Sequence, residues 1–442
     1  MSPSRFIRPM LLTACVLALA IGLTVAAAVL RGGRPGSGSA TALPASTMPA
    51  TAVPSLQALQ ALQAQLRAHP RDAQGWAGLG LAYVEQARIS ADPTYYPKAD
   101  RALARAERLA PTAALTLVGQ ATLAAARHDF AGALRRADQA IAVDPFSAQA
   151  FAVRADALTE LGRYGPARTA AAEADDLRPG SSTFARLSYA AELRGNLTRA
   201  SSLMKDAQDA ATSPSSFAFA AFHLGELSRA AGQPRAAAAH YTAALAAAPG
   251  YAPALAGRAR LAVARGDLAA AERDYTQVVQ RLPLTEYVVE LGELYAATGR
   301  PQLAEQQWSV ARASAVLATA NGVVTDLDTA LFEADHGSPV KAVAAAHAEW
   351  DRRRSIHVAD ALGWALHAAG KDRAALRHAR FATSLGTQDA RLLFHRGVIE
   401  AALGHDADGR RHLRAALRLD DGVSPFREQQ AQRLLASLGG PR

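Results

Sequence analysis

A pattern of small residues recurs along this chain at a spacing of 34 residues. Each copy contains a glycine, two small apolar positions with a larger position between them, and a closing proline. Two consecutive copies are Gly232, Ala237, Tyr241, Ala244 and Pro249, and then Gly266, Ala271, Tyr275, Val278 and Pro283. An earlier copy is Gly162, Ala167, Ala171, Ala174 and Pro179. Such a period predicts a stack of similar units, in which each unit buries its apolar face only against its neighbours.

The residues before each glycine repeat in the same register. The copies are Leu79-Gly80-x-x-Tyr83, Leu224-Gly225, Leu291-Gly292-x-x-Tyr295 and Leu362-Gly363-x-x-Leu366. With Trp76, the first copy reads W-x-x-L-G-x-x-Y, which resembles the tetratricopeptide repeat. The resemblance implies two antiparallel helices, A and B, in every unit. It therefore implies an all-α fold, a right-handed superhelical α-solenoid of about ten helix pairs.

The register divides some 350 residues into ten units. We expect these units at about 76–111, 114–147, 148–181, 181–214, 218–251, 252–284, 285–319, 323–355, 356–389 and 390–421. About seven extra residues around Ser90 to Tyr95 lengthen the A–B turn of the first unit. The seventh and eighth units lack the closing proline, so we expect their B helices to run on through Ala320 and Arg353.

The many alanines have a physical reason in such a stack. Helix B of one unit lies between helix A of the same unit and helix A of the next, so small residues such as Gly225 and Ala237 allow close approach. Tyr241 is expected to fill the gap between neighbouring units. Gly232 would form the turn between the two helices, and Pro249 would end helix B.

Both ends of the array are expected to carry an additional helix. A stripe of leucines at Leu56, Leu59, Leu62 and Leu66 ends at Pro70. After the last unit, a helix begins at Ser424-Pro425. It carries the apolar residues Phe426, Leu434, Leu435 and Leu438. An array end needs a cap of this kind, because its last apolar face has no neighbour.

The N-terminus contains an apolar segment. Pro9 to Leu30 carries no charge and is long enough to cross a bilayer as a helix, which predicts a membrane anchor. Two alternatives are a cleaved signal with its small residues at Ala26 to Ala28, and a lipoprotein signal ending at Cys15. A long polar domain after a first apolar segment is normally translocated, so we expect the repeats to lie outside the cytoplasm.

These features predict five consecutive regions. They are an N-terminal tail (1–8), the anchor or signal (9–30), a flexible linker rich in Gly, Ser and Pro (31–55), the repeat array (56–421) and a capping helix with its tail (422–442).

Charge and cysteine content exclude several classes of function. The net charge of +9 combines +4 before residue 55, −1 from 55 to 350 and +6 after 350. Only four of the 48 basic residues are lysine, a bias typical of genome composition, so we expect no nucleic-acid partner. The single cysteine, Cys15, allows neither an intrachain disulfide nor a multi-cysteine metal site.

No catalytic motif is present in the sequence. It lacks H-E-x-x-H, G-x-S-x-G in a strand–turn–helix context and a phosphate loop, so we expect no enzyme activity and no cofactor. The segment His405 to His412 is expected to form a polar turn followed by a solvated helix face; the alternative is a metal site, for which the ligand types fit but the spacing implies no tetrahedral set. The run Asp351-Arg352-Arg353-Arg354 suits a helix end, or could contact an acidic partner or anionic lipid.

Repeat arrays of this family bind on the concave side, which is lined by A helices. In the ninth unit, four residues with the spacing of one helical face are His357, Asp360, Trp364 and His367. The tenth unit adds Arg391 and Phe394, and the middle units add Tyr189, Phe219, Phe222 and Glu226. These ten residues are the predicted contacts to an unidentified protein or peptide partner. The alternative for Trp364 is packing between helices.

A shorter segment carries a second resemblance. Leu62-x(3)-Leu66-x(3)-Pro70-x-Asp72-x(2)-Gly75-Trp76-x(2)-Leu79-Gly80-x(2)-Tyr83 is similar to the opening of the exported repeat domains of cytochrome c maturation proteins. The expected function is therefore a membrane-tethered scaffold for protein–protein contacts outside the cytoplasm. The alternative is an accessory factor in cytochrome c maturation or in metal or cofactor handling.

Overall fold

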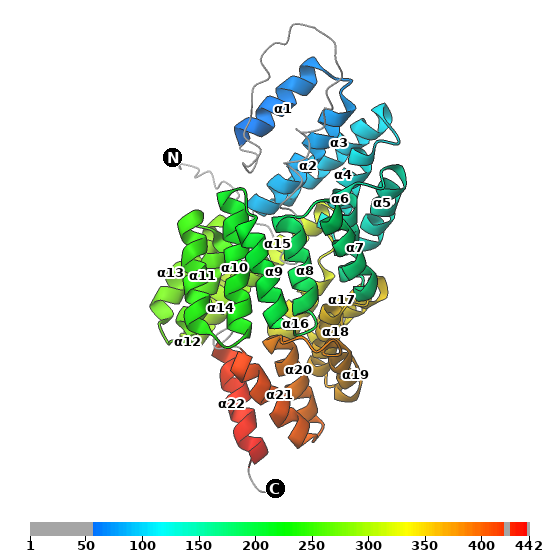
Figure 1. Ribbon diagram of the computed structural model, residues 1–442. Coiled ribbons are helices and arrows are strands. Elements are labelled where there is room, and N and C mark those ends of the chain that lie inside the picture. Colours follow the sequence, from blue (N-terminus) through cyan, green and yellow to red (C-terminus); the bar gives the residue numbers. More distant parts are fainter. Residues whose placement is uncertain (1–55, 420–424, 440–442) are drawn as a thin grey trace, which may run out of the picture.

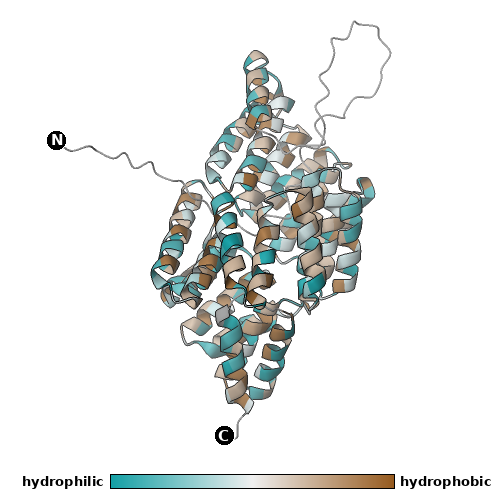
Figure 2. Ribbon diagram, turned by 90° about the vertical axis from the view of Figure 1, so that its left-hand side faces the viewer, coloured by the Kyte–Doolittle hydropathy of each residue, from teal (hydrophilic) through white to brown (hydrophobic). Residues whose placement is uncertain are grey.

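The computed structural model describes residues 56–419 and 425–439, and every regular element in these two ranges is helical. Ten antiparallel helix pairs follow one another along a coiled path, between an N-terminal and a C-terminal helix (Figure 1). Figure 2 shows hydrophilic and hydrophobic residues mixed along each helix, as expected where each helix has one buried and one exposed side. The predicted all-α array of about ten helix pairs is confirmed.

The helices have the following bounds. The terminal helices are α1 (Leu56–Ala68) and α22 (Pro425–Gly439). The A helices are α2 (Ala73–Ser90), α4 (Ala114–Ala126), α6 (Ala148–Glu160), α8 (Ser181–Glu192), α10 (Pro214–Ala230), α12 (Ala252–Ala264), α14 (Thr285–Ala297), α16 (Asp326–His336), α18 (Ile356–Ala368) and α20 (Ala390–Ala402). The B helices are α3 (Tyr96–Leu109), α5 (Phe130–Val143), α7 (Tyr164–Leu177), α9 (Leu197–Asp209), α11 (Pro234–Ala247), α13 (Leu268–Arg281), α15 (Pro301–Ala320), α17 (Pro339–Arg352), α19 (Asp372–Ala382) and α21 (Asp406–Leu419).

The local departures from the repeat are partly as expected. A short 3-10 helix, η1 (Pro93–Tyr95), lies in the lengthened A–B turn of the first unit. Helix α15 has 20 residues and ends at Ala320, as predicted. Helix α17 was expected to be long, but it has 14 residues, the length of most B helices. Its unit instead begins with a shorter A helix, α16, of 11 residues.

Tyr241 shows how alanine-rich helices pack in this fold. Its side chain is fully buried on α11, between the A helix of its own unit and that of the next. A Cβ atom on either Gly225 of α10 or Gly257 of α12 would overlap the Tyr241 ring. Both glycines therefore provide the space that the ring fills. The turn before α11 uses Gly232 at φ 68°, a conformation that side-chain-bearing residues rarely adopt.

The coil returns on itself, so that early units contact late units. The Val324 amide donates to the Arg127 carbonyl at 3.0 Å, and His128 Nδ1 lies 2.7 Å from the Val324 carbonyl. The Ile356 amide, at the start of α18, donates to the Tyr164 hydroxyl of α7 at 2.8 Å. The second and third units are thereby joined to the turns before the eighth and ninth units. The pitch of the coil is fixed by these contacts as well as by neighbour packing.

Helix α22 covers the end of the array. Leu434, Leu435 and Leu438 pack against a cluster that includes Leu413 of α21 and Val398 of α20. The side chain of Phe426, which was predicted to share this role, lies outside the part of the chain whose side chains are described. The predicted anchor at residues 9–30 also lies outside the described residues. Within those residues, no helix combines the length and apolar character needed to span a bilayer.

Candidate partner-binding pocket

A cavity of ≈ 400 Å³ lies on the concave side of the array. Its walls come from consecutive A helices: α8, α10, α12, α14, α16 and α18, with the start of α20. Apolar side chains form part of the wall, among them Leu193, Val289 and Leu331. Because each A helix contributes one face to the inside of the coil, residues from seven units meet around one space.

The polar part of the described lining is rich in carboxylates. Eight aspartates and glutamates line the cavity, against four arginines and one histidine. Some of the acids are paired with these arginines and some are not. The two groups differ in chemistry, because a paired carboxylate is held ionised while an unpaired buried one resists ionisation.

One group of paired acids surrounds Arg260 of α12. The Arg260 guanidinium lies 2.7 Å from a Glu290 oxygen of α14 and 3.5 Å from a Glu226 oxygen of α10. Glu226 also accepts from the Tyr241 hydroxyl and from Arg229. Burial by itself would raise the pKa of Glu226, but Arg229 and Arg260 outweigh it and hold that pKa at about 2.

A second group of paired acids lies where α22 meets α14 and α16. Arg427 of α22 contacts an Asp335 oxygen at 3.1 Å, and Trp364 Nε1 donates to the other Asp335 oxygen at 2.8 Å. Glu293 lies 3.0 Å from Nε2 of His336. Burial favours the neutral Asp335, but Arg427 and then His395 outweigh it and lower the pKa of Asp335.

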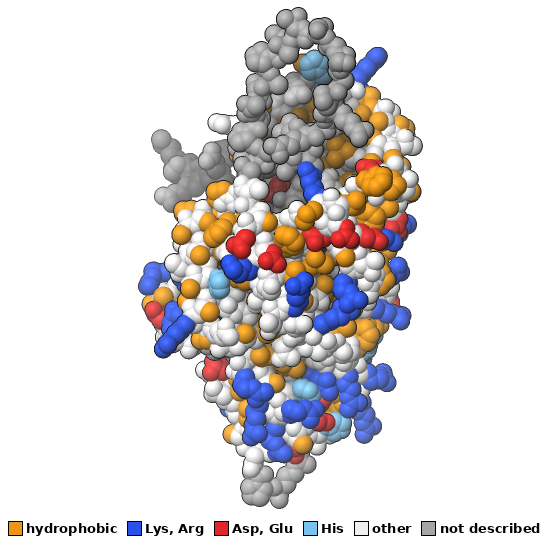
Figure 3. Space-filling view, in the orientation of Figure 1, with side chains coloured by type: hydrophobic (Ala, Val, Ile, Leu, Met, Phe, Trp, Pro, Cys, Tyr) orange, Lys and Arg blue, Asp and Glu red, His pale blue; other side chains and the backbone are white. Residues whose placement is uncertain are grey.

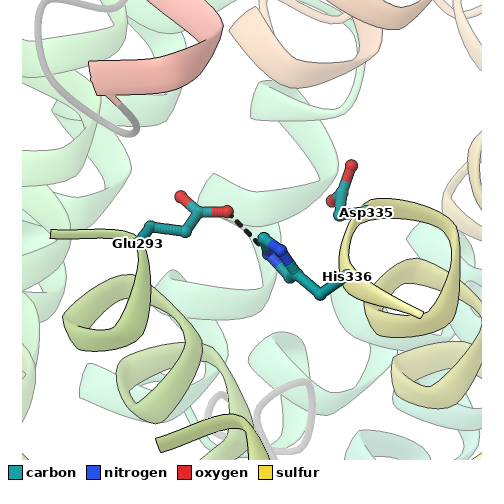
Figure 4. A group of neighbouring side chains, drawn as sticks. All are labelled: Glu293, Asp335 and His336. Atoms are coloured by element: carbon teal, nitrogen blue, oxygen red, sulfur yellow. Dashed lines mark hydrogen bonds and ion pairs between the residues drawn. The ribbon is translucent and has the colours of Figure 1, made fainter. Parts of the chain in front are cut away.

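Glu293, Asp335 and His336 also have the composition of a metal site. One ligand atom of each lies within 4.8 Å of the others (Figure 4). Figure 4 shows Glu293 and His336 pointing toward each other, with the Asp335 carboxylate turned away from their hydrogen bond. Both Asp335 oxygens accept hydrogen bonds, one from Trp364 and one from Arg427, so a metal ion would have to compete with a cationic guanidinium for this carboxylate.

Two lining carboxylates have no hydrogen bond or ion pair among the described residues, Glu192 of α8 and Asp328 of α16. Burial, followed by the negative charges of Asp389 and Glu226, raises the pKa of Glu192 to about 7. Burial also raises the pKa of Asp328. A further lining acid, Glu286, has its pKa raised to about 8 by burial. This part of the lining is therefore short of positive charge.

Four of the ten predicted contact residues line the cavity: Tyr189, Glu226, His357 and Arg391. The Tyr189 hydroxyl and His357 Nε2 share a hydrogen bond of 3.2 Å, which joins α8 to α18. Burial and then the nearby Arg391 lower the pKa of His357, so its imidazole is neutral at pH 7.

The structure places the other six predicted residues in helix packing. Trp364 is 7% exposed, and its indole stacks on His395 of α20 at 4.0 Å between ring centroids. Asp360 accepts from His395 at 2.9 Å, and His367 Nδ1 lies 2.5 Å from Asp372. Phe394 and Phe219 are buried, and Phe222 packs against the Tyr241 cluster.

The predicted groove of the ninth unit is therefore filled. The face of α18 that carries Asp360 and Trp364 packs against α20, and the cluster around Trp364 includes the α22 leucines. The acidic lining of the middle units was not predicted, apart from Glu226. A signal for it exists: Leu-Gly-Glu occurs at Leu224 to Glu226 and again at Leu291 to Glu293, and both glutamates face the cavity.

The two charged segments singled out earlier have structural partners. Arg352 pairs with Glu349 and Asp326, and Arg353 is buried against Glu349 and Glu160. His412 Nδ1 lies 2.5 Å from the buried Glu400. Figure 3 shows Lys and Arg side chains gathered over the lower part of the face in view, where Figure 1 places α20 to α22. This surface therefore accounts for part of the net charge of +6 carried by the residues after 350.

The tetratricopeptide repeat family model matches residues 118–182, 222–283 and 256–315. No curated protein sequence gives a significant match. Among solved structures, the chain resembles PilW, a widely conserved type IV pilus biogenesis factor, with 21% identity, 44% of this chain and 90% of that chain covered, and a TM-score of 0.38.

Two longer solved structures are also similar. They are the human IFIT1 dimer with m7Gppp-AAAA, with 14% identity, 82% and 86% covered and a TM-score of 0.47, and the APC/C hetero-tetramer Cut9–Hcn1, with 13% identity, 87% and 93% covered and a TM-score of 0.38. The segments matched by the family model form the antiparallel helix pairs described above. The helix pairs in these segments therefore resemble tetratricopeptide repeats.

Proposed function

We propose that this protein is a scaffold that binds a segment of a partner protein in its concave cavity. The observation that carries the proposal is the convergence of seven A helices on one cavity of mixed apolar and charged lining. Helical repeat arrays use their concave surfaces in this way, because successive units present a row of side chains to one extended ligand. Tyr189, Glu226, His357 and Arg391 are the predicted contact residues in this site.

The proposal includes a membrane tether. The uncharged segment from Pro9 to Leu30 supports an anchor, and the linker from 31 to 55 would separate it from the first helix. A single apolar segment followed by a long polar domain supports a location outside the cytoplasm. The scaffold would then hold its partner close to the membrane surface.

The test fills the cavity with a bulky side chain. Val289 of α14 lines the cavity, and Val340 of α17 is 79% exposed on the outside of the array, so Val289→Trp and Val340→Trp are a matched pair. Both variants and the wild type are used to capture partners from a detergent extract of the source cells. We expect Val289→Trp to lose the captured partner and Val340→Trp to keep it, with both proteins melting as one transition. Equal capture by both variants would place the binding site elsewhere.

The second candidate function is an accessory role in cytochrome c maturation or in metal or cofactor handling. The observation that favours it is the segment from Leu62 to Tyr83, in which α1 and α2 are separated by Pro70 and Leu66 is buried between them. The same capture experiment separates the two candidates by the identity of the partner. Haem or metal proteins would support the accessory role, and assembly components would support the general scaffold.

A further inference from the structure

We propose that the cavity recognises a basic peptide segment, by binding an arginine or lysine side chain of the partner beside Glu192 and Asp328. This inference rests on the proposed function, because it names the partner chemistry of the same cavity. It is independent of which protein carries the segment.

Negative groups outnumber positive groups in the described lining. Eight carboxylates face four arginines in one cavity, so the lining attracts cations unless a carboxylate is protonated. Peptide carboxylates and nucleic-acid phosphates would meet a surface of their own sign. A cationic side chain is the peptide group whose charge complements the lining.

The cavity wall already binds guanidinium groups of the chain itself. Arg427 reaches from α22 to Asp335 of α16, and Arg260 of α12 lies between Glu226 and Glu290. Arg260 is thus contacted by carboxylates of two different A helices, and Arg427 by the carboxylate of a third. The lining is therefore built from positions at which a guanidinium fits and is held by charge-assisted hydrogen bonds.

Glu192 and Asp328 have no such cationic partner among the described residues. The charged groups that act on Glu192 are Asp389 and Glu226, which repel its charge, and Arg229, which is already hydrogen-bonded to Glu226. Both side chains are partly buried, and a partly buried carboxylate without a partner is unfavourable, so its pKa rises. A ligand cation beside Glu192 would remove this penalty.

Within the part of the chain that the structure describes, Asp328 likewise has no arginine nearby that is free of other carboxylates. His128, Arg353 and Arg391 attract its charge and Glu349 repels it, but Arg353 is bound to Glu349 and Glu160. Arg391 lies 3.5 Å from Asp360. Both arginines near Asp328 are thus engaged by other carboxylates, and His128 Nδ1 lies 2.7 Å from the Val324 carbonyl. The Asp328 carboxylate therefore remains available for a ligand.

The apolar wall suits a side chain with a long stem. Leu193, Val289 and Leu331 lie in the same lining as the carboxylates, so the methylene groups of arginine or lysine would pack on them while the charged end reaches an acid. A cavity of ≈ 400 Å³ is in the size range of sites that enclose most of a ligand, about 300–1,000 Å³. A peptide segment rather than a lone ion fills such a space.

The experiment selects peptides on the full-length protein in detergent. A phage-displayed library of random octapeptides is passed over the wild type, over Val289→Trp, over the double variant Glu192→Gln/Asp328→Asn and over the control Asp206→Asn. Asp206 is an exposed carboxylate on α9, outside the cavity. We expect arginine and lysine to be enriched at least threefold on the wild type and the control, and this enrichment to disappear on the other two variants.

A second arm measures the charge requirement directly. The strongest selected peptide is synthesised with arginine and with citrulline, its neutral isostere, and binding is followed by fluorescence anisotropy. We expect at least tenfold weaker binding of the citrulline peptide to the wild type, and a smaller difference on Glu192→Gln/Asp328→Asn. Each side-chain amide keeps the shape of the acid it replaces, so a thermal melt near that of the wild type establishes that the double variant is folded.

Several outcomes would overturn the inference. They are selected peptides without arginine or lysine enrichment, equal binding of the two synthetic peptides, or unchanged enrichment on the double variant. Spermidine that displaces the peptide at equal concentration would assign the site to a free polyamine instead. If these results occur while Val289→Trp still abolishes partner capture, the scaffold function stands and only the partner chemistry is wrong.

Discussion

Glu160, the last residue of α6, forms a buried ion pair with Arg353, which directly follows α17, although 193 positions separate them in the sequence. The side chains of Glu160 and Arg353 are 8% and 3% exposed. Arg353 also contacts Glu349, and its guanidinium lies over the Phe130 ring at 4.8 Å. The third unit is thereby joined to the end of the eighth.

We expect Glu160→Ala to destabilise the whole array. Breaking a buried pair typically costs about 3–5 kcal/mol of unfolding free energy, and because Arg353 keeps its contact with Glu349, we expect a loss toward the lower end of this range. The matched control is the exposed pair Lys205–Asp209, for which Asp209→Ala should cost less than about 1 kcal/mol. Urea denaturation measures both. A similar small loss for the two variants would show that the pair does not stabilise the return of the coil.

Trp364→Ala should destabilise the fold rather than only weaken partner binding. The indole is stacked on His395 and donates to Asp335, so truncation leaves a cavity and removes a hydrogen bond. Truncation of a buried aromatic side chain costs about 3–5 kcal/mol. Thermal melting of Trp364→Ala, compared with Trp364→Phe, measures the loss. An unchanged melt of the alanine variant with lost partner capture would restore the groove interpretation of this residue.

Deletion of 423–442 should expose the end of the array. Helix α22 supplies Leu434, Leu435 and Leu438 to the last hydrophobic cluster, and Arg427 to Asp335. We expect a lower melting temperature and increased binding of an apolar fluorescent dye, because the exposed cluster becomes accessible. Removal of 440–442 alone is the control. Identical melting of both truncated proteins would contradict a capping role.

Glu192→Gln should stabilise the protein at alkaline pH. Burial raises the pKa of Glu192 to about 7 from its ordinary value of 4.5, so the neutral acid is favoured in the folded state. Its contribution to stability is full below pH 4.5 and is lost as the pH rises through 7. At pH 8 the glutamine variant should therefore be more stable than the wild type, by up to roughly 3 kcal/mol.

Urea denaturation at pH 4 and pH 8 tests this dependence on pH. The stabilisation by Glu192→Gln should be small at pH 4 and present at pH 8. The exposed control Asp206→Asn should change the unfolding free energy little at either value. A stabilisation that is equal at both pH values would mean that ionisation of Glu192 is not its cause.

The orientation of the membrane tether is tested by a reporter fused after Arg442. We expect a reporter that is active only outside the cytoplasm to be active in this fusion. The same reporter fused to a chain that lacks 1–30 should be inactive, since the segment from Pro9 to Leu30 would direct export. Activity of only a cytoplasmic reporter would reverse the proposed topology.

The fold could be predicted from sequence because its determinants are local. One interface between adjacent units is filled by the Tyr241 ring, for which Gly225 and Gly257 leave the space. Residues with this spacing recur along the chain. The site could be predicted only in part. Its lining depends on how the coil brings distant units together and on the position of α22, and neither follows from the local repeat pattern. Asp360 and Trp364 have the helical spacing of concave residues, yet α20 packs on them.

The contacts between early and late units also affect how the molecule responds to a stretching force. An open array of helix pairs extends easily under force. Each unit contacts only its neighbours, so small rotations between units add up along the axis. In this protein, distant units of the coil are cross-linked by the Glu160–Arg353 ion pair and the Tyr164–Ile356 hydrogen bond. We therefore expect the array to resist stretching more than an open array of the same length would.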